Sequence, residues 1–138
     1  RVYTLTGDGE IQEGQIWEAF MFAGAKKIDN LTVIIDNNGL QIDGPVAEVM
    51  NPTPHDEKLR AFGWHVISIN AHDFSEIEAA INEAKTVKGK PTAIIMKSVK
   101  GKGVSYMENK CEWHGQAPKQ DLYEVAIADL TAIKESLK

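Results

Sequence analysis

The chain begins with two apolar stretches separated by a segment of helical length. The apolar stretches, Val2–Thr6 and Leu31–Ile35, are rich in β-branched residues and predict strands. The pattern from Ile11 to about Ile28 predicts a helix between them. A crossover between parallel strands is right-handed, so the carboxyl ends of both strands reach the same edge of the sheet. This unit favours an α/β fold with a ligand site outside that edge.

Polar residues and glycines follow both predicted strands. Asp8 follows the first strand between Gly7 and Gly9, and Asn38 follows the second. Carboxylate and amide oxygens suit Mg²⁺ or Ca²⁺, and Mg²⁺ commonly completes its shell with phosphate oxygens. The glycines allow backbone amides to approach a phosphate, and a helix that starts just after them would point further amides at it. These residues predict a site for a divalent cation and a diphosphate.

Ordered motifs along most of the chain resemble those of the transketolase family, which uses thiamine diphosphate. The resemblance reaches to about residue 120, and it implies the diphosphate-binding (PP) domain: a parallel sheet with helices on both faces. The motifs are Gly7-Asp8-Gly9-Glu10, Gln12-Glu13-Gly14, Trp17-Glu18-Ala19, Asn30-Leu31, Ile42-Asp43-Gly44, Lys100-Gly101-Lys102-Gly103-Val104 and Trp113-His114-Gly115.

The resemblance implies a role for individual residues in the cofactor site. Asp8 and Asn38 would bind Mg²⁺ or Ca²⁺ through their side chains, and Leu40 through its backbone carbonyl. Ile42 would lie against the thiazolium side of the cofactor, although an ordinary apolar turn residue explains it equally well. The other implied cofactor-binding residues are Gly7, Gly9, Glu10, Lys100 and His114.

Two residues acquire catalytic roles from the resemblance. His114 would contact the diphosphate and a substrate hydroxyl. Glu13 would join a carboxylate link towards the cofactor-activating glutamate of a partner chain, although a glutamate near a helix N-terminus is favourable in any case. The stretch Lys97–Pro118, which contains Lys100 and His114, lacks periodicity, and loops of that length are often functional.

Strands and helices continue to alternate after the first unit, as in a parallel α/β sheet. In the first helix, an apolar stripe is predicted to lie on the sheet, formed by Trp17, Met21, Gly24 and Ile28. Trp17 is predicted to be a core residue. The later strands are predicted at Trp64–Ile69 and Thr92–Met96, with helices at His55 to about Phe62, Asp73 to about Val87 and from Asp121 onward.

Length and composition describe one ordinary globular domain. The net charge of −5 over 138 residues gives no reason to expect binding to nucleic acid, and no apolar run has the length of a membrane span. The single cysteine, Cys111, excludes an internal disulfide and fits a reducing cytoplasm. Arg1 leads directly into a strand of buried type. Residues 1–138 are therefore predicted to be one partial PP domain, without the upstream segment and the pyrimidine-binding domain of the family.

The resemblance implies part of a transketolase, which moves a two-carbon ketol unit between sugar phosphates in the pentose phosphate pathway. The enzyme would be a dimer or heterotetramer that includes a pyrimidine-binding domain or subunit, and this chain alone would be inactive. Alternatives are a 1-deoxyxylulose-5-phosphate synthase-like or other thiamine-diphosphate enzyme, and a non-catalytic cofactor-binding or assembly module. Mg²⁺-dependent phosphoryl transfer is disfavoured because no Gly-x-x-x-x-Gly-Lys-Ser/Thr motif occurs.

Overall fold

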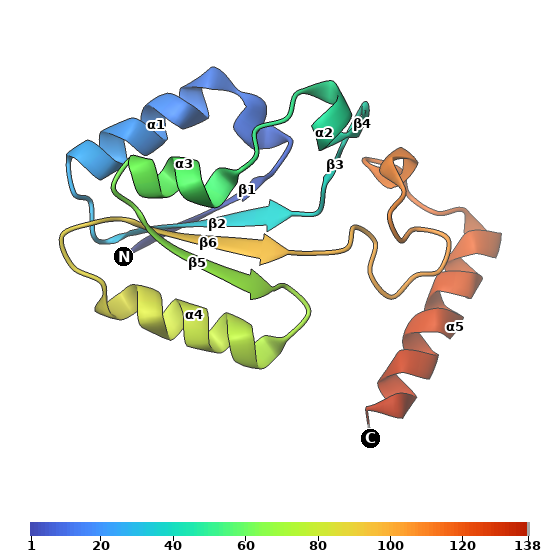
Figure 1. The fold of residues 1–138 in the computed structure, drawn as a ribbon. Coiled ribbons are helices and arrows are strands. Elements are labelled where there is room, and N and C mark those ends of the chain that lie inside the picture. The colour runs from blue at the N-terminus through green and yellow to red at the C-terminus, as the bar shows by residue number, and fades with distance from the viewer. Residues whose placement is uncertain (138) are drawn as a thin grey trace.

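A computed structural model describes residues 1–137, in which a parallel sheet forms the centre of the fold. Its strands lie in the order β1-β2-β6-β5, and each neighbouring pair is parallel (Figure 1). The predicted strands are confirmed, with small shifts at their ends. Their bounds are Val2–Gly7 for β1, Leu31–Asn37 for β2, His65–Asn70 for β5 and Thr92–Lys97 for β6.

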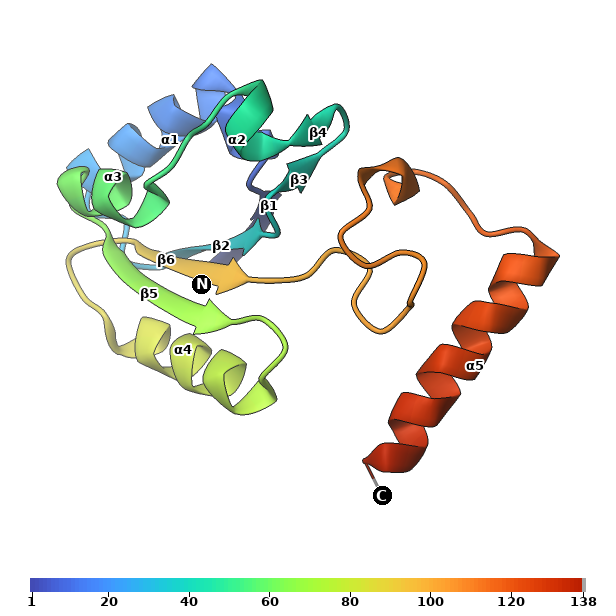
Figure 2. The same cartoon turned by 45° about the vertical axis from the view of Figure 1, so that its right-hand side comes forward.

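Helices cover both faces of this sheet, as predicted. Helices α1 (Gly14–Ala25) and α3 (His55–Ala61) lie on one face, and α4 (Phe74–Thr86) lies on the other (Figure 1). Helix α5 (Gln120–Ser136) lies beyond the carboxyl ends of the strands (Figures 1 and 2). No helix within residues 1–137 is both long enough and apolar enough to cross a membrane.

A small antiparallel hairpin stands at the carboxyl edge of the sheet. It pairs β3 (Leu40–Gln41) with β4 (Gly44–Pro45), which leaves residues 42 and 43 in its turn. The short helix α2 (Val46–Val49) follows at once. Pro45 precedes the first helical residue with φ −61° and ψ 130°, the extended conformation typical of a helix N-cap.

Alternation along the strands divides the core into two layers. On β2, Val33 and Ile35 belong to the cluster packed under α1 and α3, whereas Ile34 packs against the cluster under α4. Successive strand residues point to opposite faces, so one apolar strand supplies both layers. The cluster under α4 is centred on Ala80, Ala84 and Ile94.

The first helix differs from its prediction at both ends. Residues Glu10–Gln12 form a 3₁₀ turn, η1, and Glu13 is extended with φ −70° and ψ 129°. The α-helix therefore begins at Gly14 and ends at Ala25, rather than running from Ile11 to Ile28. Ile11 is fully buried through the 3₁₀ turn, so its apolar character serves core packing and not the helix.

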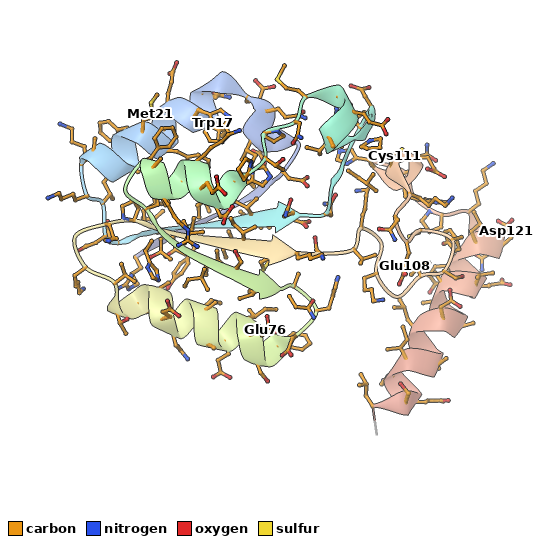
Figure 3. The ribbon with its side chains drawn as sticks, in the orientation of Figure 1. Trp17, Met21, Glu76, Glu108, Cys111 and Asp121 are labelled. Atoms are coloured by element: carbon orange, nitrogen blue, oxygen red, sulfur yellow. The ribbon has the colours of Figure 1, made fainter. Side chains whose placement is uncertain are left out.

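The apolar stripe of α1 is also shifted from its prediction. Phe20 and Ala23 are buried, whereas Met21 is 48% exposed. Figure 3 shows Trp17 and Met21 on α1. Trp17 packs partly buried against the core and meets the ring of Phe20 edge-on at 5.7 Å, which agrees with its prediction as a core residue.

Gly24 makes a close contact with the end of α3 and not with the sheet. A Cβ atom at this position would lie 2.0 Å from the carbonyl oxygen of Phe62. The indole of Trp64 donates to the Phe20 carbonyl nearby, at 2.8 Å. Glycine at position 24 therefore allows α1 to approach the residues that connect α3 to β5.

Two further predictions concern helix α4 and strand β1. The carboxylate of Asp73, where this helix was predicted to begin, accepts hydrogen bonds from the amides of Ser75 and Glu76 and so caps α4. Strand β1 was expected to be of buried type, but its Leu5 side chain is 66% exposed. Among the strands of residues 1–137, it pairs with β2 alone and lies at the edge of the sheet.

Candidate cofactor and metal site

A cavity of about 690 Å³ lies at the carboxyl ends of β1 and β2. The β3–β4 hairpin borders it, and the loop after β6 contributes residues from its far side. Every site residue predicted from the sequence lines this cavity: Gly7, Asp8, Gly9, Glu10, Glu13, Asn38, Leu40, Ile42, Lys100 and His114. The fold therefore gathers residues that are far apart along the chain.

Asp8 is the buried carboxylate of the site, with 1% of its surface exposed. Its Oδ2 accepts a hydrogen bond from the Gly39 amide at 2.6 Å, and its Oδ1 accepts one from the Gly9 amide at 2.9 Å. Its own amide donates to the carbonyl of Asp36 at 3.1 Å. These bonds fix the carboxylate between the ends of the two strands.

The pKa of the Asp8 carboxyl is raised above its ordinary value, chiefly because burial disfavours the charged form. The negative charge of Asp36 raises it further, while the amides of Gly39 and Gly9 act in the opposite direction. A divalent cation beside Asp8 would relieve this cost by supplying a compensating charge.

The loop from Asn38 to Leu40 faces Asp8 and is held in a local turn. The side-chain oxygen of Asn38 accepts a hydrogen bond from the Leu40 amide at 2.9 Å. Gly39 between them has φ +78°, a conformation that glycine adopts readily. The predicted cation ligands thus come from two strand ends that meet at one edge, as the crossover argument requires.

Gly7 lies at an open part of the cavity, next to Glu10. A Cβ atom at Gly7 would meet nothing within 4 Å, so the backbone here borders open space. The Gly7 amide donates to a carboxylate oxygen of Glu10 at 3.2 Å. In this structure the Gly7 amide therefore has the Glu10 carboxylate as its partner.

Gly9 serves a different purpose from Gly7. A Cβ atom at Gly9 would lie 2.5 Å from the Cβ of Gln41, on strand β3. The absence of a side chain here lets the hairpin pack over the loop after β1.

The prediction that an α-helix starts directly after the glycines is wrong, because the 3₁₀ turn Glu10–Gln12 lies between them and α1.

The loop after β6 brings Lys100 and His114 to the cavity. The Nζ of Lys100 lies 3.5 Å from Nδ1 of His114. Acidic side chains outnumber this lysine around the cavity; they are Asp8, Glu10, Glu13, Asp36 and Asp43. A bare diphosphate would be repelled by such a lining, whereas a diphosphate that carries a divalent cation would not.

Some cavity residues were not assigned from the sequence: Gln12, Asp36, Gln41, Asp43 and Val49. Asp36 directly follows the apolar run of β2, so the signal that identified Asp8 also applied to it.

Within residues 1–137, no three His, Cys, Asp or Glu side chains gather into a metal-binding group. The predicted ligand set of one carboxylate, one amide and one carbonyl would not form such a group.

A parallel α/β sheet with a polar cavity outside the carboxyl ends of its strands is the arrangement with which open α/β domains bind ligands. Residues 1–131 match the family described as "Transketolase, thiamine diphosphate binding domain". The chain belongs to the transketolase family, and the predicted family and fold are confirmed.

Similar proteins include separate transketolase subunits. The chain is 45% identical over 129 residues to the 6-deoxy-6-sulfo-D-fructose transketolase subunit SqwG of Clostridium sp. (strain MSTE9), a match that covers 94% of this chain and 47% of that protein. It is 39% identical over 138 residues to an apulose-4-phosphate transketolase subunit from Phocaeicola vulgatus, covering 100% of this chain and 49% of that one. The chain therefore spans about half the length of these relatives.

Solved structures show the same fold. The transketolase of Campylobacter jejuni superposes with a TM-score of 0.88 at 35% sequence identity, covering 95% of this chain and 20% of that one. This chain therefore has the fold of the matching part of that transketolase.

Proposed function

We propose that this chain holds the diphosphate of thiamine diphosphate through a divalent cation, Mg²⁺ or Ca²⁺. Asp8 and Asn38 would bind the cation through side-chain oxygens, and Leu40 through its carbonyl. The observation that carries this proposal is the 2.6 Å hydrogen bond from the Gly39 amide to Asp8, which brings both strand ends together. Oxygen donors of this kind suit Mg²⁺, which binds few carboxylates and shares phosphate oxygens.

The diphosphate would lie along Gly7, where the cavity is open, with Lys100 and His114 on its far side. Glu10 and Gly9 border this position, and Glu10 would have to release the Gly7 amide when a phosphate oxygen takes its place. The acidic lining explains why the cation is needed, because it offsets the repulsion between those carboxylates and the diphosphate. Ile42, 68% exposed at the tip of the hairpin, is free to cover an apolar part of the cofactor.

The full enzyme would transfer a two-carbon ketol unit between sugar phosphates, as in the pentose phosphate pathway. When bound, thiamine diphosphate supplies the electron sink for that unit, while the protein supplies binding and orientation. Within this chain, His114 would donate a hydrogen bond to a substrate hydroxyl or the diphosphate. Glu13, the extended residue before α1, would contact the partner chain that carries the activating carboxylate.

The active assembly would contain a second part that binds the pyrimidine ring, in a dimer or heterotetramer. The support comes from relatives that are named as subunits and are about twice as long as this chain. We propose that residues 1–138 are one piece of the PP domain of such an enzyme and are inactive alone. A cytoplasmic location also stays a prediction.

Calorimetric titration of the assembled enzyme with thiamine diphosphate, with and without Mg²⁺, tests this function. Binding should require the cation, and Asp8→Ala and Asn38→Ala should each abolish it. Glu78→Gln, on the exposed surface of α4, serves as the matched control and should bind normally. Equal binding without Mg²⁺, or normal binding by both site variants, would contradict the proposal.

A screen of sugar-phosphate donors and acceptors separates the enzymatic alternatives. Transfer between ketose and aldose phosphates supports a transketolase. Activity with other donors alone would favour a 1-deoxyxylulose-5-phosphate synthase-like enzyme, and cofactor binding without any turnover would favour a binding or assembly module.

A further inference from the structure

Residues 98–137, which we call the C-terminal arm, form a unit beyond the sheet. Figures 1 and 2 both show its loop and α5 outside the carboxyl ends of the strands, and Glu108 and Cys111 lie within this loop (Figure 3). The ring of Tyr106 lies 5.0 Å from the ring of Trp113, and its hydroxyl donates to the Leu122 carbonyl at 2.9 Å. The loop is therefore braced against itself and against α5.

The two arm residues that reach the cavity are fixed within this unit. The amide of Asn109 donates to the Lys100 carbonyl at 3.0 Å, and the amide of His114 donates to the Cys111 carbonyl at 2.9 Å. The adjacent Tyr106–Trp113 contact ties the 3₁₀ turn Cys111–Trp113 to the rest of the loop. The positions of Lys100 and His114 over the cavity thus depend on how the arm as a whole is held.

The arm is joined to the sheet at its first two residues. Within residues 1–137, the hydrogen bonds between the arm and the preceding chain all involve Ser98 or Val99. The hydroxyl of Ser98 donates to Asp36 Oδ1, and its amide donates to the Asn37 carbonyl at 3.4 Å. The amide of Val99 donates to Nε2 of His72 at 2.9 Å.

These bonds reach two separate parts of the carboxyl edge, the end of a strand and a turn. Asp36 lies at the end of β2, while His72 lies in the turn between β5 and α4. Asp36 also accepts the Asp8 amide through its carbonyl and lines the cavity. One residue therefore connects the loop that carries the buried carboxylate to the arm that carries Lys100.

We propose that Asp36 and His72 are positioning residues, which act through Ser98 and Val99 to hold Lys100 and His114 against the diphosphate site. This proposal rests on the proposed function of that site. Neither residue needs to touch the cofactor, because each fixes the backbone that leads into the arm.

Ser98→Ala in the assembled enzyme tests the proposal, with Ser98→Thr as the variant that keeps a hydroxyl. Ser75→Ala, on the exposed first turn of α4, controls for loss of a hydroxyl elsewhere. Hydrogen exchange of residues 99–115, measured without cofactor, should become about tenfold faster in Ser98→Ala, the size expected for a lost hydrogen bond to a charged acceptor. Ser98→Thr and Ser75→Ala should exchange like the wild type, and His72→Ala should accelerate exchange of the Val99 amide.

A double-mutant cycle gives the functional readout. His114→Ala should reduce kcat/KM by a smaller factor in the Ser98→Ala background than in the wild type, because a misplaced His114 side chain contributes less to kcat/KM. Unchanged exchange in Ser98→Ala, or independent effects of the two substitutions, would overturn the proposal. If the wild-type enzyme bound no thiamine diphosphate, the proposed function would be wrong, whereas unchanged exchange in an enzyme that does bind it rejects the positioning role alone.

Discussion

The Gly39 amide donates to the Asp8 carboxylate across the ends of two neighbouring strands, at 2.6 Å. This contact places the loop that carries Asn38 and Leu40 next to a buried negative charge. The charge is costly where it stands, since burial raises the pKa of Asp8. A site built in this way is less favourable for the protein alone than for the protein with a bound cation.

Binding of the cation should weaken in acid. A proton and Mg²⁺ compete for the Asp8 carboxylate, and its raised pKa brings this competition closer to neutral pH. The Mg²⁺-dependent affinity for thiamine diphosphate should therefore fall as the pH is lowered through that pKa. Asp8→Asn should lose about 100-fold or more in this affinity and should no longer respond to pH in this way. Calorimetry between about pH 8 and about pH 5 measures both effects, and a flat profile in the wild type would contradict the assignment.

Gly7→Ala should separate ligand binding from folding. The new methyl group enters open cavity space, so the free energy of unfolding should change by less than about 0.5 kcal/mol. The affinity for Mg²⁺-thiamine diphosphate should fall about tenfold, because the methyl group would occupy the position that we propose for a phosphate.

Gly9→Ala provides the contrast for this experiment. Its methyl group would meet Gln41 at 2.5 Å, so unfolding should become easier by about 1–3 kcal/mol. Urea unfolding combined with calorimetry distinguishes the two variants. Tight cofactor binding by Gly7→Ala would show that the diphosphate lies elsewhere.

Gly24→Ala should destabilise the fold although alanine favours helices. The methyl group would overlap the Phe62 carbonyl, which is backbone and cannot rotate away, at a cost of about 2 kcal/mol or more. Gly14→Ala is the matched control in the same helix, because nothing lies within 4 Å of its Cβ position. It should be neutral or stabilising by up to about 1 kcal/mol. Equal unfolding midpoints for the two variants would show that α1 and α3 can separate without cost.

His55→Leu should stabilise the protein, most strongly below neutral pH. His55 is 4% exposed, and neither ring nitrogen has a hydrogen-bond partner within residues 1–137. Burial lowers its pKa, with a smaller contribution from Lys58, while Asp56 opposes the shift. The unfolded chain therefore binds a proton more readily, and stability falls as the pH drops below about 6.5.

The leucine variant removes both the unpaired ring nitrogens and this titration. It should gain about 1–2 kcal/mol at neutral pH and more at about pH 5.5. Thermal unfolding of the assembled enzyme at the two pH values measures the difference. A variant less stable than the wild type at both would show that His55 has a partner that its surroundings in residues 1–137 do not provide.

Much of the fold and the site followed from local patterns. The β-branched runs marked the strands, and polar residues directly after β1 and β2 marked the cavity. The bend at Glu13 could not be predicted. Ile11 is apolar because it packs in the core, and its spacing from the later apolar residues fits a helix equally well. The burial of Phe20 in place of Met21 depends on how α1 lies against α3, which is set by long-range packing. The hydrogen bond between Ser98 and Asp36 could not be predicted, because the two residues are far apart along the chain.

The exposed side of β1 has a practical consequence for preparing the protein. Unsatisfied backbone groups along an apolar edge strand invite pairing with strands of other molecules. Val2, Tyr3 and Leu5 on this strand are exposed, and their apolar side chains increase the tendency to associate. Purified by itself at high concentration, the polypeptide should therefore self-associate through this edge, and dilute samples should behave better.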